Sequence, residues 1–185
     1  MPVAIYSETA KKISDALHLG LSLGQKRSQI AQAIEQALLT LLYRALAWVG
    51  DSFIDAFRGA SLEVYQANSD IVIGWAWMAD LMGEPPPCGA CTAEHGSIHP
   101  LDEDMNSHNK CRCVQEPVTA NSPDIQSGAD WFDEQDEATQ RDIVGTQVGY
   151  DLISSGDATL DDFVGYTYDG SLYQRSVKQI TGGKK

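Results

Sequence analysis

The sequence predicts an α+β protein: a mainly helical domain with a small β element and a Cys/His segment of the zinc-knuckle type, followed by an acidic helical extension. Three observations predict this class. Apolar residues recur at helical spacing over most of residues 4–68. A run of β-branched and aromatic residues follows at 71–78, as is typical of a strand. All four cysteines then fall within residues 88–113.

Two helices are expected at the N-terminus. The first covers residues 4–19, where Ile13 and Leu17 recur at helical spacing and Gly20 and Gly24 mark the end. Ser28 is expected to cap the second helix. The apolar face of this second helix comprises Ile30, Ile34, Leu38, Leu41, Leu42 and Leu46.

A third helix is expected after Gly50 and Asp51, which should break or kink the preceding run. This helix extends to about residue 68. Its inward-facing residues are expected to be Phe53, Ala56, Phe57, Ala60, Val64 and Tyr65.

The predicted strand covers residues 71–78. Trp75 and Trp77 lie two residues apart and therefore share one face, which we expect to pack on the helices. Residues 83–87 contain three consecutive prolines, which supply no amide donors, so this stretch is expected to be irregular.

The composition of the chain changes after the cysteines, and it suggests four parts. Residues 1–115 form the main module, and 116–127 are expected to be a linker. An acidic helical extension covers 128–165, with one dense acidic helix over 130–142 that carries Trp131 and Phe132. Residues 166–185 are expected to be a polar and partly mobile tail.

The charge of the chain disfavours nucleic acid as a general partner. Thirteen Lys and Arg against 26 Asp and Glu give a formal charge of −13, whereas binding to phosphates depends on basic residues. No signal peptide is evident, and the apolar stretches at 37–49 and 71–81 are shorter than the ~20 residues of a spanning helix. The cysteines are therefore expected to be in a reducing cytosol, where thiols bind metals more readily than they form disulfides.

The cysteine spacing indicates a metal site. Cys88 and Cys91 form a Cys-x-x-Cys pair, and His108, Cys111 and Cys113 follow 17 to 22 residues after Cys91. These five candidate ligands compete for four tetrahedral positions, and the sequence leaves open which four bind. Thiolate and imidazole ligands favour zinc over magnesium or calcium.

Two other interpretations of these cysteines are weighed. The first is a pair of disulfides or free buried thiols. The second is a catalytic zinc, which needs an open position and a general base such as Glu94. His95 and His99 are expected to be ordinary loop or outer-shell groups, and Glu94 a surface carboxylate. A site saturated with thiolates leaves no position for water, which favours a structural role and no enzymatic activity.

Other catalytic signatures are missing from the sequence. It contains neither a Gly-x-x-x-x-Gly-Lys phosphate loop nor a Gly-x-Ser-x-Gly elbow. The acidic run around Asp130 to Glu137 is expected to be a solvated helix face.

Several stretches together resemble the Mu F-like head morphogenesis family, the minor head proteins of tailed phages. Residues 56–68 are similar to that family's Tyr-Arg-x-x-x-x-x-x-Tyr-x-x-Asn helix, and Gly74-Trp75-Ala76-Trp77 resembles its Gly-Trp-x-Trp strand. The most specific element is His108-x-x-Cys111-Arg112-Cys113. Cys88-x-x-Cys91, His95-Gly96, the 99–103 stretch, Asp130-Trp131-Phe132, residues 137–140 and Gly145 also resemble family segments in the same order.

The resemblance implies a few-copy virion protein inside the head, present in the host cytoplasm during assembly. Such a protein acts near the portal in procapsid assembly, DNA packaging or ejection. Its expected partners are the phage portal and other head proteins, with at most weak or indirect contact with viral DNA and none with a membrane. Its expected cofactor is structural zinc. The alternative is a zinc-dependent hydrolase, or a nuclease or toxin-like module of a mobile element.

Overall fold

The computed structural model describes residues 2–182. Its contacts divide the chain into two compact units, Met1–Ser52 and Phe53–Lys185, which we call the N-terminal and C-terminal units. Helix α2 begins in the first unit and ends in the second. The coarse α+β prediction is confirmed, because helices make up most of the regular structure and the strands form two small antiparallel sheets.

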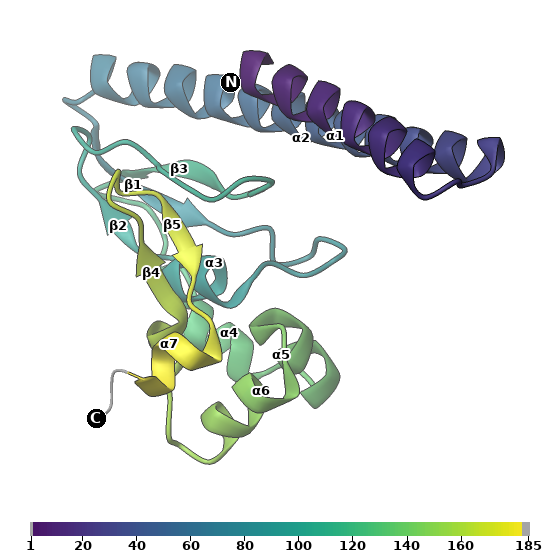
Figure 1. The fold of residues 1–185 in the computed structure, drawn as a ribbon. Helices are drawn as coiled ribbons and strands as arrows, with labels where there is room; N and C mark the ends of the chain where they lie inside the picture. The colour runs from purple at the N-terminus through teal and green to yellow at the C-terminus, as the bar shows by residue number, and fades with distance from the viewer. Residues whose placement is uncertain (1, 183–185) are drawn as a thin grey trace. The chain divides into compact units, whose positions relative to one another are not determined.

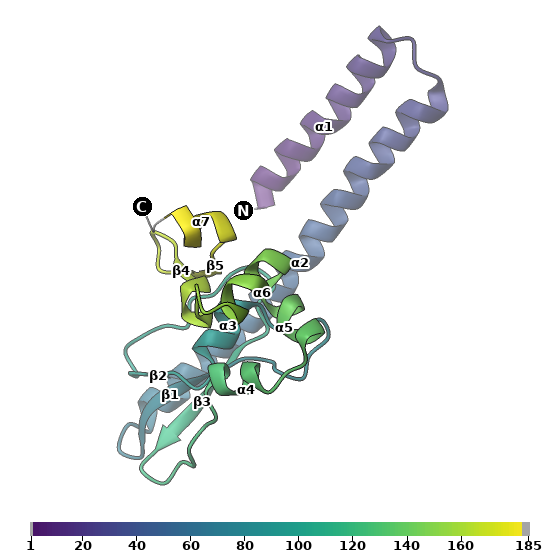
Figure 2. The ribbon, with the colours of Figure 1, turned by 90° about the horizontal axis from the view of Figure 1, so that it is seen from below.

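The N-terminal unit is a helical hairpin. Helix α1 (Pro2–Ser22) and the first part of α2 (Arg27–Ala67) lie side by side and antiparallel (Figures 1 and 2). Gly24, with a φ of 61°, provides the left-handed turn between them. The helices approach closely at Gly20, where a Cβ would lie 2.5 Å from the Cγ1 of Ile30. Glu8 and Arg44 form an ion pair of 2.6 Å between the two helices.

Helix α2 corrects the prediction of two separate helices. It passes through Gly50 and Asp51 without a break, because an internal glycine costs a helix only about 1 kcal/mol and keeps its amide donor. Ser28 lies inside the first turn and is not the cap. Instead the backbone amide of Lys26 donates to the Gln29 side chain at 2.9 Å.

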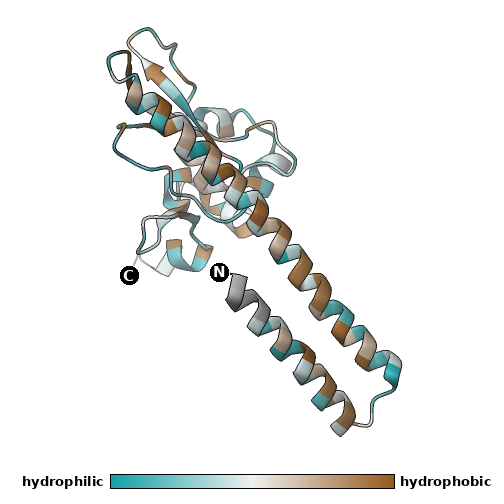
Figure 3. Cartoon of the chain, turned by 90° about the horizontal axis from the view of Figure 1, so that it is seen from above, coloured by the Kyte–Doolittle hydropathy of each residue, from teal (hydrophilic) through white to brown (hydrophobic). Residues whose placement is uncertain are grey.

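The unbroken α2 is also longer than the apolar stretches seen in the sequence. Within residues 2–182 it is the one helix long and apolar enough to cross a membrane, judged by length and composition alone. Apolar residues recur along its ribbon (Figure 3). Length and composition alone do not place the chain in a membrane.

The inward face predicted for residues 53–65 is wrong except at Tyr65, which is partly buried and packs against the core of the C-terminal unit. Phe53, Phe57 and Val64 are exposed, whereas Arg58 and Leu62 are buried. Apolar residues occur on more than one side of this helix, and helical spacing alone does not say which side meets the core.

A three-stranded antiparallel sheet forms the centre of the C-terminal unit. Strand β1 (Val72–Met78) lies between β2 (Ile98–His99) and β3 (Val114–Thr119). Trp75 and Trp77 are both buried in one cluster with Leu62 of α2, which confirms the strand and its helix-facing tryptophans. As expected, residues 83–87 contain no regular structure.

The first part of the expected linker at 116–127 is regular structure. Residues 116–119 belong to β3, which pairs along the length of β1, for example Trp77 with Gln115. Pro117 is tolerated there because β3 is an edge strand.

The acidic extension is a set of short segments and not one long helix over 130–142. They are α4 (Gly128–Asp133), α5 (Glu137–Val144), α6 (Gln147–Ser154) and the 3₁₀ turn η1 (Leu160–Phe163). Helix α4 ends at Asp133, and Asp136 caps α5, because its side chain accepts a hydrogen bond from the Thr139 amide at 2.8 Å. Phe132, Ile143, Val144, Leu160 and Phe163 form a second core cluster.

The expected polar, partly mobile tail is largely ordered. It contains the end of β4 (Val164–Tyr166), all of β5 (Leu172–Gln174) and α7 (Val177–Gly182). Leu172 is 0% exposed in the tryptophan cluster, and Ile180 is buried in the second cluster. Residues 183–185 of this predicted tail lie outside the described residues. Two apolar side chains of an otherwise polar stretch therefore belong to the cores of the C-terminal unit.

Candidate metal centre

Two short segments supply the five candidate ligands. Cys88 is the N-cap of α3 (Gly89–Glu94), so it and Cys91 project from the first turn of one helix. His108, Cys111 and Cys113 lie on the loop that leads into β3. Lys110 has a φ of 62°, and this left-handed residue helps to close the turn in which the Cys111 amide bonds the His108 carbonyl at 3.2 Å.

The five ligand atoms form two groups that share Cys91. One group is Cys88, Cys91 and His108, and the other is Cys91, Cys111 and Cys113; within each, the atoms lie within 4.8 Å of one another. Nε2 of His108 lies 3.3 Å from Sγ of Cys88 and 3.2 Å from Sγ of Cys91. The sulfurs of Cys91 and Cys111 are 3.7 Å apart.

The sulfur–sulfur distance fits ligands of one metal ion, and the two nitrogen–sulfur distances are a few tenths of an ångström shorter than the usual separation. In a tetrahedral site with metal–sulfur bonds of about 2.3 Å, neighbouring ligand atoms are about 3.5–3.8 Å apart. A disulfide would need sulfurs about 2.05 Å apart, and all four cysteines are free. The structure therefore brings the five predicted residues into one cluster that can hold a metal ion.

The close packing of the four thiols shifts their pKa values in opposite directions. Hydrogen bonds, first from Cys91 and then from His108, lower the pKa of Cys88 to about 5. Hydrogen bonds from Cys113 and Cys91 lower the pKa of Cys111 below the usual thiol range. Conversely, contact with Cys111 raises the pKa of Cys113 to about 12 and also raises that of Cys91.

The lowered and raised pKa values of neighbouring cysteines mean that these buried thiols cannot all ionise without a positive charge among them. His108 supplies part of that charge, since its hydrogen bond with Cys88 raises its pKa to about 9. A bound cation would take the place of the protons that the thiols and imidazole hold.

Two side chains distant in sequence hold the ligand segments in place. Arg58 of α2, which is 4% exposed, donates from Nε and Nη2 to the Cys113 carbonyl at 3.1 and 2.7 Å. Its Nη1 donates to Ser107 at 2.7 Å. Gln174 of β5 accepts from the Gly89 amide at 2.6 Å and donates to the Val144 carbonyl at 2.9 Å.

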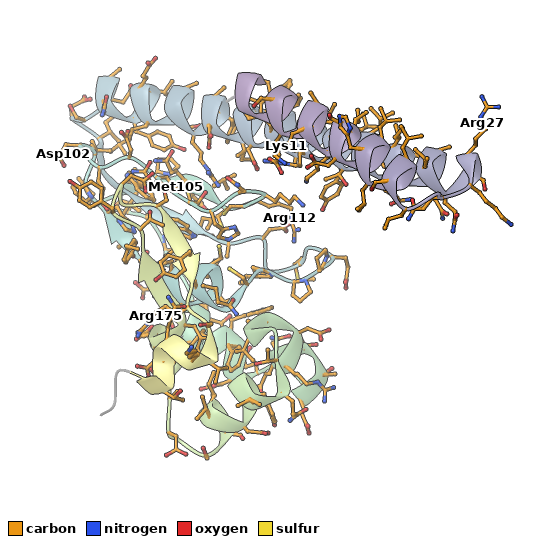
Figure 4. The ribbon with its side chains drawn as sticks, viewed as in Figure 1. Lys11, Arg27, Asp102, Met105, Arg112 and Arg175 are labelled. Carbon is orange, nitrogen blue, oxygen red and sulfur yellow. The ribbon has the colours of Figure 1, made fainter. Side chains whose placement is uncertain are left out.

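The His108 ring and Arg112 make further contacts at the metal centre. Nδ1 of His108 lies 2.9 Å from the Asn109 carbonyl, which leaves Nε2 directed at the sulfurs. Arg112, labelled in Figure 4, pairs with Asp80 at 2.7 Å and bonds the Pro85 carbonyl at 2.5 Å. Arg112 therefore fixes the irregular 80–86 segment beside the site.

Glu94, His95 and His99 do not join the ligand groups among residues 2–182. Nδ1 of His95 accepts from the Ala79 amide at 3.0 Å, and burial lowers the pKa of this histidine. His99 stacks on Trp75 with ring centroids 4.3 Å apart. Both histidines are structural groups outside the ligand groups, as the sequence analysis expected.

Glu94 is not the surface carboxylate that the sequence suggested. Its side chain is 14% exposed and accepts hydrogen bonds from Tyr166 at 2.5 Å and Ser97 at 3.0 Å. Burial, followed by the bond to Glu94, raises the pKa of Tyr166 above its usual value. Glu94 thus joins α3 to β4 and is engaged away from the sulfur cluster.

The Cys88–His108 edge of the cluster borders an open groove of about 500 Å³. Pro85, Pro86, Asp142, Ile143, Gly145 and Gln174 form the rest of its lining. The opposite edge, at Cys111 and Cys113, is buried in the tryptophan cluster.

No protein-family model, curated protein or solved structure matches this chain.

Proposed function

We propose that this chain is a minor structural protein of a tailed-phage head, with a structural zinc ion at the sulfur–imidazole cluster. The observation that carries the structural role is the pair of three-donor groups that share Cys91 and together bring four sulfurs and one imidazole into one cluster. The resemblance of the Gly-Trp-x-Trp and His-x-x-Cys-Arg-Cys segments to Mu F-like head proteins supplies the biological setting.

Zinc is favoured over other ions by the donor set. Four sulfurs and one imidazole suit zinc, whereas magnesium and calcium prefer oxygen ligands. When bound, the ion supplies a crosslink between α3 and the loop before β3 and takes no part in a reaction.

The chain's own residues extend this crosslink through the C-terminal unit. Arg58 connects α2 to the Cys113 carbonyl, and Gln174 connects β5 to the start of α3. A rigid unit of this kind suits a protein whose task is to present surfaces to partners. The proposed partners are the portal and other head proteins, and contact with viral DNA would be weak or indirect because the chain is acidic.

Mass spectrometry of purified procapsids and mature heads from the encoding phage tests this function. We expect the chain in both particles at a few copies per portal. Its absence from both, with the protein free in the lysate, would overturn the head assignment.

A second candidate, a zinc-dependent hydrolase or a nuclease or toxin-like module, is favoured by one observation: the groove beside Cys88 and His108. If only three of the five donors bound the ion, the fourth position would be open to water on that side. Zinc-loaded protein would then hydrolyse nucleic acid or peptide substrates, and Asp142→Asn in the groove wall would reduce the rate. Lack of hydrolysis by the loaded wild type would reject this candidate.

A further inference from the structure

The N-terminal hairpin leaves a broad apolar stripe uncovered. Six large side chains of α2 are between 47% and 63% exposed, and all fall within residues 38–49. They are Leu38 (48%), Leu39 (51%), Leu42 (56%), Tyr43 (62%), Leu46 (63%) and Val49 (47%). We call this set the α2 stripe. Single exposed apolar residues are common on proteins, but a continuous row of this kind marks a contact surface.

The α2 stripe is a second apolar face of a helix whose first apolar face, or seam, packs on α1. Within the hairpin, the buried and half-buried residues of α2 include Ile30, Ile34, Ala37, Leu41 and Ala45. The α2 stripe also repeats every three or four residues, but it is centred roughly 120° around the helix from that first seam. A helix with two such seams is built to contact two neighbours, as in a helical bundle. Helix α1 is one neighbour.

The described chain does not supply the second neighbour. Within residues 2–182, no helix other than α1 and α2 is longer than eight residues. A seam covering residues 38–49 needs a helix of about three turns or more alongside it. Among residues 2–182, therefore, no further helix is long enough to cover this seam.

Charge and area favour a second copy of this chain as that neighbour. The N-terminal unit has five Lys and Arg and four Asp and Glu, whereas the rest of the chain has eight and 22. With histidine neutral, the formal charges are +1 and −14, so two hairpins can meet without the repulsion that other parts of the chain would impose. Each of the six stripe residues is 47% or more exposed, so a second stripe can bury a large part of the ~800 Å² that each partner contributes to a stable interface.

A lipid bilayer suits the hairpin less well. Lys11, Lys12 and Asp15 lie along α1, and the Glu8–Arg44 pair joins the two helices at side-chain exposures of 44% and 42%. Insertion would remove these charges from water, which strongly disfavours it.

We propose that two copies of this chain associate through the α2 stripes of their hairpins to form a four-helix bundle. The stripe of one copy then packs against the same stripe of the other, as a two-fold interface requires. This inference does not depend on the head assignment, because it rests on the hairpin alone.

Light scattering after size exclusion tests the proposal, with the full chain loaded with zinc at concentrations of about 1–50 µM. We expect a species of twice the 20.1 kDa chain mass that survives molar salt, because the interface is apolar. The double variant Leu42→Glu/Leu46→Glu should raise the dissociation constant at least ~100-fold, since four carboxylates would be buried per dimer.

The matched control is Ala33→Glu/Thr40→Glu, which adds the same charge to exposed positions of α2 outside the stripe. It should remain dimeric. Helical circular dichroism and zinc content should be unchanged in both variants, because all four positions are exposed. Three results would each overturn the proposal: a monomer at about 50 µM, a dimer unaffected by the stripe variant, or a monomer that floats with vesicles of phosphatidylglycerol and phosphatidylethanolamine.

Discussion

Cys91 is the residue on which both ligand groups depend, since its sulfur belongs to each of them. The sequence predicted the five candidate donors but left open which four bind, because the short spacings within 88–91 and 108–113 bring each set of ligands together locally. It did not predict Arg58 or Gln174 as the groups that position the loops. Their contacts span 55 and 85 residues, and only the fold decides which distant side chain reaches a given carbonyl or amide.

Replacing His108 tests whether this histidine is a direct ligand of the metal ion. We expect His108→Gln to weaken zinc binding by more than about 100-fold, because the loss of a direct ligand should exceed the effect of losing an outer-shell partner. Competition with a chromophoric chelator measures the affinity. His18→Gln, on exposed α1, is the control and should bind zinc like the wild type. Equal affinity in the two variants would remove His108 from the site.

The pKa of Glu8 indicates whether its ion pair with Arg44 joins the two helices of the hairpin. Hydrogen bonds from Arg44 and Lys12 lower the pKa of its carboxyl from 4.5 to about 2. Because the folded pKa is below the unfolded one, the ion pair contributes fully above about pH 4.5 and is lost as pH falls through about 2. Carbon-detected NMR titration should show this low midpoint. In Arg44→Gln the midpoint should move up toward 4.5, and an unmoved midpoint would contradict the pairing.

Among the elements, the sequence located strand β1 and the two tryptophans well, because β-branched and aromatic residues at alternate positions give a strong local signal. It misjudged α2, the acidic helix and the linker. Gly50 looks like a helix stop in sequence, but its Cβ position meets open space and nothing requires the helix to end there. Strand β3 contains Glu116 and Pro117, and its strand character comes from pairing with β1.

The contact between α3 and α4 requires a glycine. A Cβ at Gly128 would lie 1.6 Å from the carbonyl oxygen of Thr92, which is backbone and cannot move aside cheaply. We expect Gly128→Ala to lower the free energy of unfolding by about 3 kcal/mol or more, as overpacking a rigid contact does. Urea denaturation measures the change.

The control for that substitution is Gly59→Ala in α2, where a Cβ meets nothing within 4 Å. Its greater helix propensity should raise the free energy of unfolding by about 0.5–1 kcal/mol. Similar changes in the two variants would mean that α3 and α4 do not pack as described.

For the whole molecule, the sequence predicted the class but not the division into units. It placed a boundary near residues 116–127, whereas the contacts divide the chain at Ser52 and Phe53, inside a continuous helix. The later segments belong to the metal-bearing unit because Leu172 is buried beside Cys91 and Cys113 in one cluster. Buried contacts between distant segments leave no local mark on composition.

Metal removal should therefore affect one unit more than the other. With a strong chelator, we expect loss of the near-ultraviolet signal of Trp75 and Trp77, which share a cluster with three of the cysteines. Much of the far-ultraviolet helical signal should persist, because α1 and residues 27–52 of α2 contain no ligand. Restoring zinc should restore the tryptophan signal. Unchanged spectra after complete metal removal would reject a structural ion.

The order of segments along the chain has a consequence during synthesis. The hairpin leaves the ribosome well before Leu172, which completes the core cluster of the C-terminal unit. About 120 residues separate the two, so at roughly 5–20 residues per second the α2 stripe is available for about 6–24 s before that core can close. Neighbouring nascent chains on one messenger would thus meet through their hairpins while their metal-binding parts are still being made.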